Sequence, residues 1–326
     1  MPFTLDEFSL LKTLTELDGV SGREDQIRNY LHKTYTELGY EVLFDNLGSI
    51  VALKKSKKEN AKRVLVDAHM DEVGFFATFK DGDHYNLIHI GYINVDTIQD
   101  ARVKVYHKDK VITKGTVNPL NGTLVLYPDE DVEICHGDMV TFEKEFLLLD
   151  GDNYICKAYD DRFGLAIGIE LLRHVKDIEL DFDLYVSGSV REEVGLKGAI
   201  TVANLVKPDL AIALDCSRAT EGELSYGKIG KGALVRFYDP AVMSFKDLID
   251  FQVKTFEKHN VTYQWFATGG GTNAGAIHTN GIGVKTLTNC VCGIDIHTDK
   301  TIISSFDYQQ AKKGLFALIE DIHEVL

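Results

Sequence analysis

The chain has 326 residues, enough to bury a sizeable core as one large domain or two smaller ones. Its 35 Lys+Arg and 50 Asp+Glu leave a formal charge of −15, which disfavours general binding to nucleic acids and to anionic membranes. No apolar run approaches the roughly 20 residues that span a bilayer, so we expect no membrane partner. The 5 Cys, an odd number without metal-ribbon spacing, favour reduced thiols in a cytoplasmic protein.

Two helices are expected at the start of the chain. Thr4 with Glu7, and Ser21 with Glu24, have the spacing of a capping box, and each pair precedes a stretch with helical apolar periodicity. Gly39 lies where the second helix should end.

Short β-type segments follow. Residues 41–45 and 49–53 are expected to pair as strands around a turn, and residues 64–68 form an apolar run typical of a buried strand. From residue 74 to residue 156, short alternating runs are separated by Gly, Asn and Asp, with no amphipathic helix. This texture predicts a small β-rich module inserted into another domain.

Beyond residue 160, strands alternate with helices. The expected helices are 162–175, 196–206, 244–259, 272–279 and 306–325, and the expected strands are 183–189, 210–214, 233–237, 262–266 and 283–287. Such alternation predicts an α/β fold with a mixed sheet sandwiched by helices. We therefore assign residues 1–73 and 157–326 to one α/β domain and residues 74–156 to the insert.

His69 follows the apolar strand 64–68 directly. Ligands of open α/β sheets bind beyond the carboxyl ends of the strands, so His69 is well placed to bind a metal ion. The carboxylate of Asp71 could orient its imidazole. A histidine that is simply satisfied at a strand end remains the alternative.

Glu192 and Glu193 lie after the predicted strand 183–189. Adjacent carboxylates repel each other unless they separate or share a cation, so one of them could bind metal while the other handles a proton. A solvated acidic turn explains the pair equally well from these residues alone.

Further acidic and histidine side chains lie at the start of a helix, at a strand end and in a loop. Asp160 and Asp161 open a helix, where acidic residues also complement the helix dipole; Asp215 ends the predicted strand 210–214, and His297 lies in a loop. Together, the histidines and carboxylates suit a pair of divalent ions such as Zn²⁺, Co²⁺ or Mn²⁺. The glycines at 269–271 lack the features of a phosphate-binding loop, and we expect them to permit a close backbone approach before a helix.

Several blocks of the sequence resemble the dinuclear-metal aminopeptidases that include bacterial glutamyl aminopeptidase and the tetrahedral (TET) peptidases. The blocks are Ala-His-Met-Asp-Glu-Val-Gly at 68–74, Asp-Asp-Arg-Phe-Gly at 160–164, Glu-Glu-Val-Gly-Leu-Lys-Gly-Ala at 192–199 and Gly-Gly-Thr-Asn-Ala-Gly at 270–275. Residues 215–217 and 230–240 resemble the glutamyl branch. The chain departs from the family pattern at 293–297, and at Asn273, where the family has Asp.

The resemblance implies a role for each of seven residues. His69, Asp160, Glu193, Asp215 and His297 would hold two divalent metal ions, most often Zn²⁺, with Asp160 bridging them. Glu192 would be the general base and acid, and Asp71 would orient His69. The insert would be a dimerisation domain of a homo-oligomer, dimeric or larger.

The resulting hypothesis is a metal-dependent aminopeptidase that hydrolyses N-terminal residues from peptides, with acidic (glutamyl or aspartyl) residues as candidate substrates. A cationic partner would then be needed, and Lys228, Lys231 and Arg236 are near in sequence. The alternatives are a metal-dependent deacylase using the same site, an enzyme similar to the family members named endoglucanases, and an inactive scaffold. Apolar clusters at 75–76, 92–93 and 146–149 are candidate interface residues of the insert.

Overall fold

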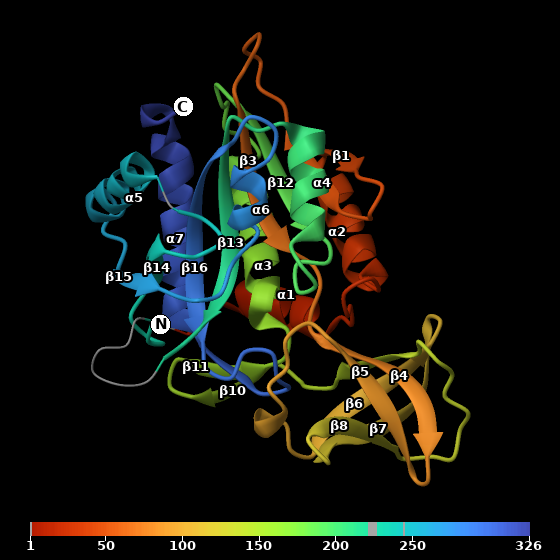
Figure 1. Ribbon diagram of the computed structural model, residues 1–326. Helices are drawn as coiled ribbons and strands as arrows, with labels where there is room; N and C mark the ends of the chain where they lie inside the picture. Colours follow the sequence, from red (N-terminus) through yellow and green to blue (C-terminus); the bar gives the residue numbers. More distant parts are fainter. Residues whose placement is uncertain (1, 221–226, 244) are drawn as a thin grey trace.

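The computed structural model describes residues 2–220, 227–243 and 245–326, and it has an α/β part with a β-barrel attached at one side (Figure 1). The strands of the main sheet are β1 (Glu41–Phe44), β2 (Ile50–Lys54), β3 (Arg63–His69), β12 (Asp183–Ser189), β13 (Leu210–Arg218), β14 (Ala233–Tyr238), β15 (Tyr263–Ala267) and β16 (Lys285–Gly293). This 8-stranded sheet has the order β1-β2-β12-β3-β13-β16-β14-β15. Its central strands β12, β3, β13 and β16 are parallel, whereas β2 pairs antiparallel with β12 and β14 pairs antiparallel with β16, so the sheet is mixed as predicted.

Helices cover both faces of this sheet. The helices are α1 (Leu5–Glu16), α2 (Asp25–Leu38), α3 (Tyr159–Val175), α4 (Lys197–Val206), α5 (Lys246–Lys258), α6 (Ala274–His278) and α7 (Ser305–Asp321). Alternate residues of β3 explain the two layers: Val64 and Val66 belong to the core that also contains residues of α1, α2, α3, α5 and α7, while Leu65 belongs to the core that contains residues of α4 and α6. Both faces of a parallel strand are thereby buried.

The capping of the first two helices differs. Thr4 and Glu7 form the complete capping box of α1, as predicted. The second capping box is wrong: α2 begins at Asp25, its N-cap is Glu24, and no side chain caps it. The predicted start of the helix at residue 244 lies outside the described residues.

The barrel is built from β4 (Gly74–Asp81), β5 (His84–Ile90), β6 (Ala101–His107), β7 (Lys110–Leu120), β8 (Thr123–Pro128) and β9 (Met139–Phe142). These strands close in the order β4-β5-β8-β7-β6-β9 around a separate core that includes Phe75, Val103 and Phe142. The chain then forms β10 (Leu147–Asp150) and β11 (Asn153–Cys156), and β11 pairs with β17 (Thr301–Ser304) near the C-terminus. The division at residues 74 and 156 stays a prediction.

Both connections of the barrel lead directly to predicted site residues. The barrel begins three residues after Asp71, and the return through β11 ends four residues before Asp160. In the described part of the chain, no helix is long and apolar enough to cross a membrane.

Candidate active site

The carboxyl ends of β3, β12 and β13 bring the predicted site residues to one edge of the sheet. His69 is the last residue of β3, and Glu192 and Glu193 follow β12. Asp215 was expected after a strand, but it lies within β13, because β16 continues to pair with β13 up to Arg218, beyond the last β13 residue that pairs with β3, Ala213. Asp160 comes from the start of α3, and His297 from the loop between β16 and β17.

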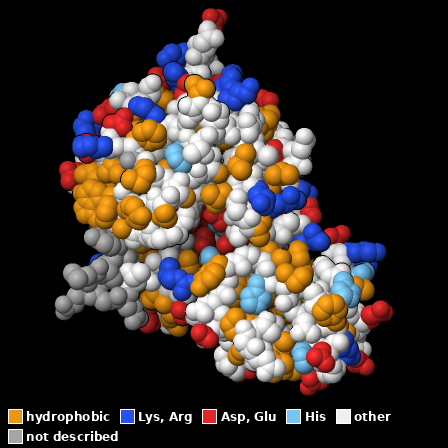
Figure 2. Space-filling model, viewed as in Figure 1, with side chains coloured by type: hydrophobic (Ala, Val, Ile, Leu, Met, Phe, Trp, Pro, Cys, Tyr) orange, Lys and Arg blue, Asp and Glu red, His pale blue; other side chains and the backbone are white. Residues whose placement is uncertain are grey.

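A cavity of about 620 Å³ opens at this edge. Figure 2 shows acidic side chains deep in a hollow between the α/β part and the barrel. Two of the predicted site residues, His69 and Asp71, do not line the cavity. His69 contacts Asp160, which does line it, and Asp71 contacts the backbone of Glu192. The other predicted residues line the cavity itself, together with two arginines and two glycines: Asp160, Glu192, Glu193, Asp215, His297, Arg218, Arg236, Gly270 and Gly271.

The two histidines converge on one carboxylate. His69 Nε2 lies 3.1 Å from Oδ1 of Asp160, and His297 Nε2 lies 3.2 Å from Oδ2 of the same side chain. The other ring nitrogen of each histidine faces a backbone carbonyl: Nδ1 of His69 is 3.0 Å from the oxygen of Asp71, and Nδ1 of His297 is 2.7 Å from that of Tyr92. A donor hydrogen at each Nδ1 leaves both Nε2 lone pairs directed at Asp160, the arrangement that metal-binding histidines use.

Two groups of potential ligand atoms overlap here. One group contains His69, Glu192 and Glu193, and the other contains Asp160, Glu193 and His297; within each group the atoms lie within 4.8 Å of one another. Asp215 belongs to neither group, although it lines the same cavity. The donors are nitrogen and carboxylate oxygen, which suit Zn²⁺, Co²⁺ and Mn²⁺.

The electrostatics also fit a bound cation. Burial raises the pKa of Glu193 to about 7 and raises the pKa values of Glu192 and Asp215 well above the ordinary range, with neighbouring carboxylates adding to the effect for each. Burial disfavours ionised Asp160 as well, but when the imidazoles of His297 and His69 are protonated, their hydrogen bonds and positive charge outweigh this effect and lower the pKa of Asp160. Without a cation, so many buried carboxylates repel one another, and divalent ions would relieve that repulsion.

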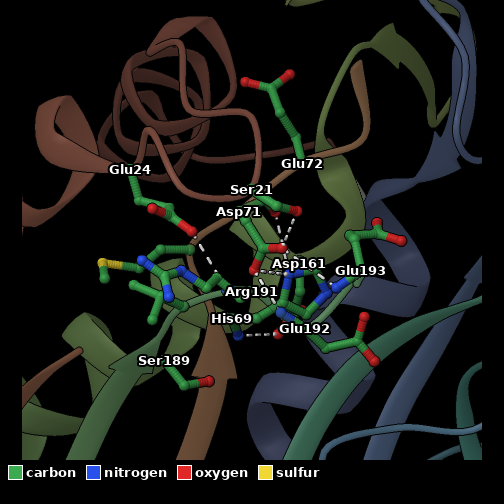
Figure 3. Close-up of polar contacts among 12 residues, drawn as sticks. Ser21, Glu24, His69, Asp71, Glu72, Asp161, Ser189, Arg191, Glu192 and Glu193 are labelled. Carbon is green, nitrogen blue, oxygen red and sulfur yellow. Dashed lines mark hydrogen bonds and ion pairs between the residues drawn. The ribbon is translucent and has the colours of Figure 1, made fainter. Parts of the chain in front are cut away.

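Asp71 is completely buried and holds the turn that carries the two glutamates. Its Oδ1 accepts a hydrogen bond from the amide of Glu192 at 2.9 Å, and its Oδ2 accepts one from the amide of Glu193 at 3.2 Å. Its Oδ1 is also 3.5 Å from Nδ1 of His69. Figure 3 shows Asp71 between His69, the glutamate turn and Ser21.

Asp161 was paired with Asp160 at the start of a helix but was given no specific role, and in the structure it contacts the end of β3. Asp161 is buried, and its Oδ2 accepts a hydrogen bond from the amide of His69 at 3.2 Å, while its Oδ1 accepts one from Gly164. The only available signal was its place beside Asp160, and the helix dipole was the better explanation of that pair when it was taken alone.

The glycine-rich stretch forms one wall of the cavity. A Cβ atom on Gly271 or Gly275 would lie 2.9 or 2.7 Å from the Cβ of Ala241, so the absence of side chains permits the close approach, as predicted. Asn273 donates to Oδ2 of Asp67 at 2.8 Å and to the Ser189 hydroxyl at 2.9 Å, which ties the start of α6 to β3 and β12.

Two arginines lie at the cavity. Arg236 is buried; its Nη1 donates to Asp239 at 2.7 Å, its Nη2 donates to the Ser217 hydroxyl, and its guanidinium lies over the ring of Phe266. Arg218 is exposed and also lines a neighbouring cavity together with Lys228.

The sequence profile of the M42 glutamyl aminopeptidase family matches residues 48–125 and 127–313. The chain is 35% identical over 346 aligned positions to a glutamyl aminopeptidase of Lactococcus lactis subsp. cremoris, with 98% of this chain and 97% of that protein covered. Among solved structures, an aminopeptidase from the archaeon Desulfurococcus kamchatkensis superimposes with a TM-score of 0.91 at 26% identity, covering 97% of this chain and 95% of that one. The TET1 peptidase of Pyrococcus horikoshii, which can assemble into a tetrahedron or a large octahedral shell, has a TM-score of 0.85 at 27% identity, covering 96% and 99%.

Proposed function

The chain belongs to the M42 family of glutamyl aminopeptidases and is a metal-dependent hydrolase that removes N-terminal residues from peptides, and we propose that the cavity at the carboxyl edge of its sheet is the active site. In this proposal, His69, Asp160, Glu193, Asp215 and His297 would hold two divalent ions, and Asp160 would be shared between them. The observation that carries the proposal is the contact of one Asp160 oxygen with each histidine, while both Nδ1 atoms face carbonyl groups.

Zn²⁺ is the expected metal, with Co²⁺ and Mn²⁺ as alternatives, because the donor set contains no sulfur and mixes imidazole with carboxylate. When bound, such ions polarise a carbonyl group and lower the pKa of water. A deep acidic cavity also attracts the cationic N-terminus of a peptide, which suits removal of single N-terminal residues.

Glu192 is the proposed proton carrier. Burial raises the pKa of its carboxyl group well above the ordinary range, and a raised pKa lets a carboxylate take up a proton more readily. In the proposed reaction, Glu192 accepts a proton from the attacking water and gives it to the leaving amine as the peptide bond breaks. The carboxylate of Asp71 keeps this glutamate in place by accepting a hydrogen bond from the Glu192 amide. The backbone oxygen and the Oδ1 atom of Asp71 both face Nδ1 of His69 and orient its ring.

Acidic N-terminal residues are the proposed substrates. Arg236 is occupied by Asp239 and Ser217, whereas Arg218 forms no ion pair with the described residues and lines the same cavity. We assign Arg218 as the partner of the substrate carboxylate, because a charged pair with a guanidinium offsets the cost of burying that carboxylate. Lys228 contributes to the adjoining cavity, and Lys231 lines neither of the two.

A homo-oligomer, at least a dimer, is the proposed assembly, supported by the shells that the TET1 peptidase of P. horikoshii forms. Some members of the predicted interface clusters are buried in the structure and others are exposed to solvent. Phe75, Ile93 and Phe146 are buried in the protein's own cores, whereas Tyr92 is 67% exposed and the three leucines at 147–149 on the edge strand β10 are between 46% and 58% exposed. The exposed members are the better candidates for contact with a second copy. A cytoplasmic location stays a prediction, and all five cysteines are unpaired thiols.

One experiment tests the proposed function directly. Protein freed of metal with a chelator and then reloaded with Zn²⁺, Co²⁺ or Mn²⁺ should hydrolyse glutamyl and aspartyl p-nitroanilides, with leucyl and lysyl substrates as comparisons. Cleavage of N-acetylated amino acids in place of free N-termini would indicate the deacylase alternative. Hydrolysis of cellulose that survives chelation would indicate the endoglucanase alternative, since a glycosidase needs two carboxylates and no metal pair.

A further inference from the structure

The loop between α1 and α2 contacts the proposed active site, although it is more than 40 residues from the nearest predicted ligand in sequence. The Ser21 hydroxyl donates to Oδ2 of Asp71 at 2.6 Å, the shortest hydrogen bond that this carboxylate accepts. Both residues are buried, so water cannot replace the hydroxyl without entering a closed site.

The backbone of the same loop runs alongside the segment that follows His69. Val20 pairs with Glu72 in a parallel bridge, the Glu72 amide donates to the oxygen of Gly19 at 3.0 Å, and the Ser21 amide donates to the oxygen of Glu72 at 3.3 Å. The position of the Ser21 side chain relative to Asp71 is therefore set by the backbone.

Glu24, three residues further on, contacts the residue that precedes the two glutamates, Arg191, whereas Ser21 contacts Asp71. Its Oε1 accepts hydrogen bonds from the amide of Gly22 at 2.7 Å and from the amide of Arg191 at 3.2 Å. Arg191 has a positive φ of 57° and directly precedes the two glutamates, so this contact supports an unfavourable backbone conformation at the start of their turn. Figure 3 shows Ser21 and Glu24 on either side of Asp71, both directed toward the site.

We propose that Ser21 and Glu24 are positioning residues of the active site, which act through Asp71 and Arg191 to place Glu192 and Glu193. Asp71 accepts hydrogen bonds from the amides of both glutamates, so a displacement of Asp71 would move the proton carrier and a metal ligand together. Neither side chain caps α2, which begins at Asp25: the Ser21 hydroxyl donates to Asp71, and the Glu24 carboxylate accepts from Gly22 and Arg191. The inference rests on the proposed function: its kinetic part needs the peptidase activity, and its Zn²⁺-affinity part needs only the proposed metal site.

The test compares Ser21→Ala with Ser56→Ala in the full-length protein. Ser56 is the matched control, because its hydroxyl donates a hydrogen bond of 2.7 Å to Leu180 at the opposite end of β12 from the site. Residues that hydrogen-bond to metal ligands typically contribute 10- to 100-fold to metal affinity or activity. We expect Ser21→Ala to lower kcat by about 10-fold, to change KM by less than about twofold and to raise the Zn²⁺ dissociation constant by about 10-fold. Ser56→Ala should leave all three values unchanged.

Zn²⁺ affinity is measured on metal-free protein by competition with a chromophoric chelator, which needs no enzymatic activity. A lack of peptidase activity in the wild type would therefore refute the proposed function, while the Zn²⁺ titration would still decide the role of Ser21. A double-mutant cycle adds a readout that a purely structural role would not produce. In an Asp71→Ala background, loss of the Ser21 hydroxyl should change Zn²⁺ affinity by less than about twofold, because its acceptor is already gone.

Two results would overturn the inference: wild-type kcat and Zn²⁺ affinity in Ser21→Ala, or the same loss of affinity with and without Asp71. If Ser21→Ala does not fold, Ser21→Cys replaces it, since a thiol is of similar size and a weaker donor. Glu24→Ala should lower kcat and Zn²⁺ affinity in the same direction, whereas Glu24→Gln, which keeps a carbonyl acceptor for the Arg191 amide, should lie closer to the wild type.

Discussion

Replacement of Lys157 by methionine tests how the site is attached to the barrel. Lys157 is 1% exposed, and its ammonium group lies 2.8 Å from both carboxylate oxygens of Glu72 and 3.0 Å from Oδ1 of Asp18. Lys104 and Tyr106 of barrel strand β6 each reach Oδ2 of the same Asp18 at 2.7 Å. Glu72 and Lys157 lie on the two chain connections that lead into and out of the barrel, so this network of ion pairs and hydrogen bonds links both connections to each other and to strand β6.

The magnitude follows from what each carboxylate loses. Removal of one partner of a buried ion pair costs about 3–5 kcal/mol when the remaining charge has no other partner. Here Glu72 keeps Arg162 at 3.3 Å, and Asp18 keeps Lys104, so we expect Lys157→Met to lower the free energy of unfolding by about 2–4 kcal/mol at pH 7. Methionine fills much of the volume of the lysine stem, so the change reports mainly on charge.

The pH dependence gives an independent check. Burial raises the pKa of Asp18, but Lys157 and Lys104 outweigh it and lower the pKa from 3.8 to about 2. At about 1.4 kcal/mol for each pKa unit, this lowering contributes about 2 kcal/mol of stability, which is present above pH 4 and is lost as the pH falls from 4 toward 2. In Lys157→Met the Asp18 pKa rises, so the difference in stability between the two proteins should narrow at pH 3.

Urea unfolding of the wild type and the variant, followed by circular dichroism at pH 7 and pH 3, measures both effects. Lys80→Met is the matched control, because its ion pair with Asp131 is solvent-exposed and should contribute less than about 0.5 kcal/mol. A loss below about 1 kcal/mol at pH 7, or a difference that widens at pH 3, would refute this account of the network.

The remaining predictions concern the reaction and the assembly. Glu192→Gln should keep its bound metal and lose activity by roughly 10²- to 10⁴-fold, whereas Glu193→Gln should weaken metal binding; metal analysis after dialysis and steady-state kinetics would expose the opposite assignment. Treatment with a chelator should abolish hydrolysis, and added Zn²⁺, Co²⁺ or Mn²⁺ should restore it; activity that persists in protein shown to be free of metal would contradict the metal site. Arg218→Ala should reduce kcat/KM for glutamyl substrates by about 10-fold or more and leave leucyl substrates within about twofold, and a preference of the wild type for lysyl substrates would contradict the acidic pocket. Light scattering should show at least a dimer at micromolar concentration and a smaller species after residues 74–156 are replaced by a Gly/Ser linker; a monomeric wild type, or an unchanged oligomer after the replacement, would contradict assembly through the insert.

Local sequence patterns were sufficient for the layers of the fold. Apolar runs and alternating periods predicted the central strands and the helices between them. A strand that is buried on both faces has a continuous apolar run, and an element that is buried on one face has apolar residues at regular intervals. The same reasoning placed His69 and the pair Glu192 and Glu193 at strand ends, and a rule about parallel sheets then brought them to one edge. The pairing of β11 with β17, across about 150 residues, left no comparable local trace.

The detailed geometry of the site depended on contacts between distant segments. Asp215 lies within a strand because β16 extends that strand, and His297 reaches Asp160 from a loop where its own φ is 64°. Ser21 has the spacing of a helix cap, but α2 begins only at Asp25, and in the folded chain the Ser21 hydroxyl donates a hydrogen bond to the buried carboxylate of Asp71. The order of residues was thus enough to identify the side chains that carry the chemistry and the edge at which they gather, because both depend on period and composition. The side chains that position these groups could be identified only from the tertiary structure. Their hydrogen bonds join residues that are far apart in the sequence and that only folding brings together.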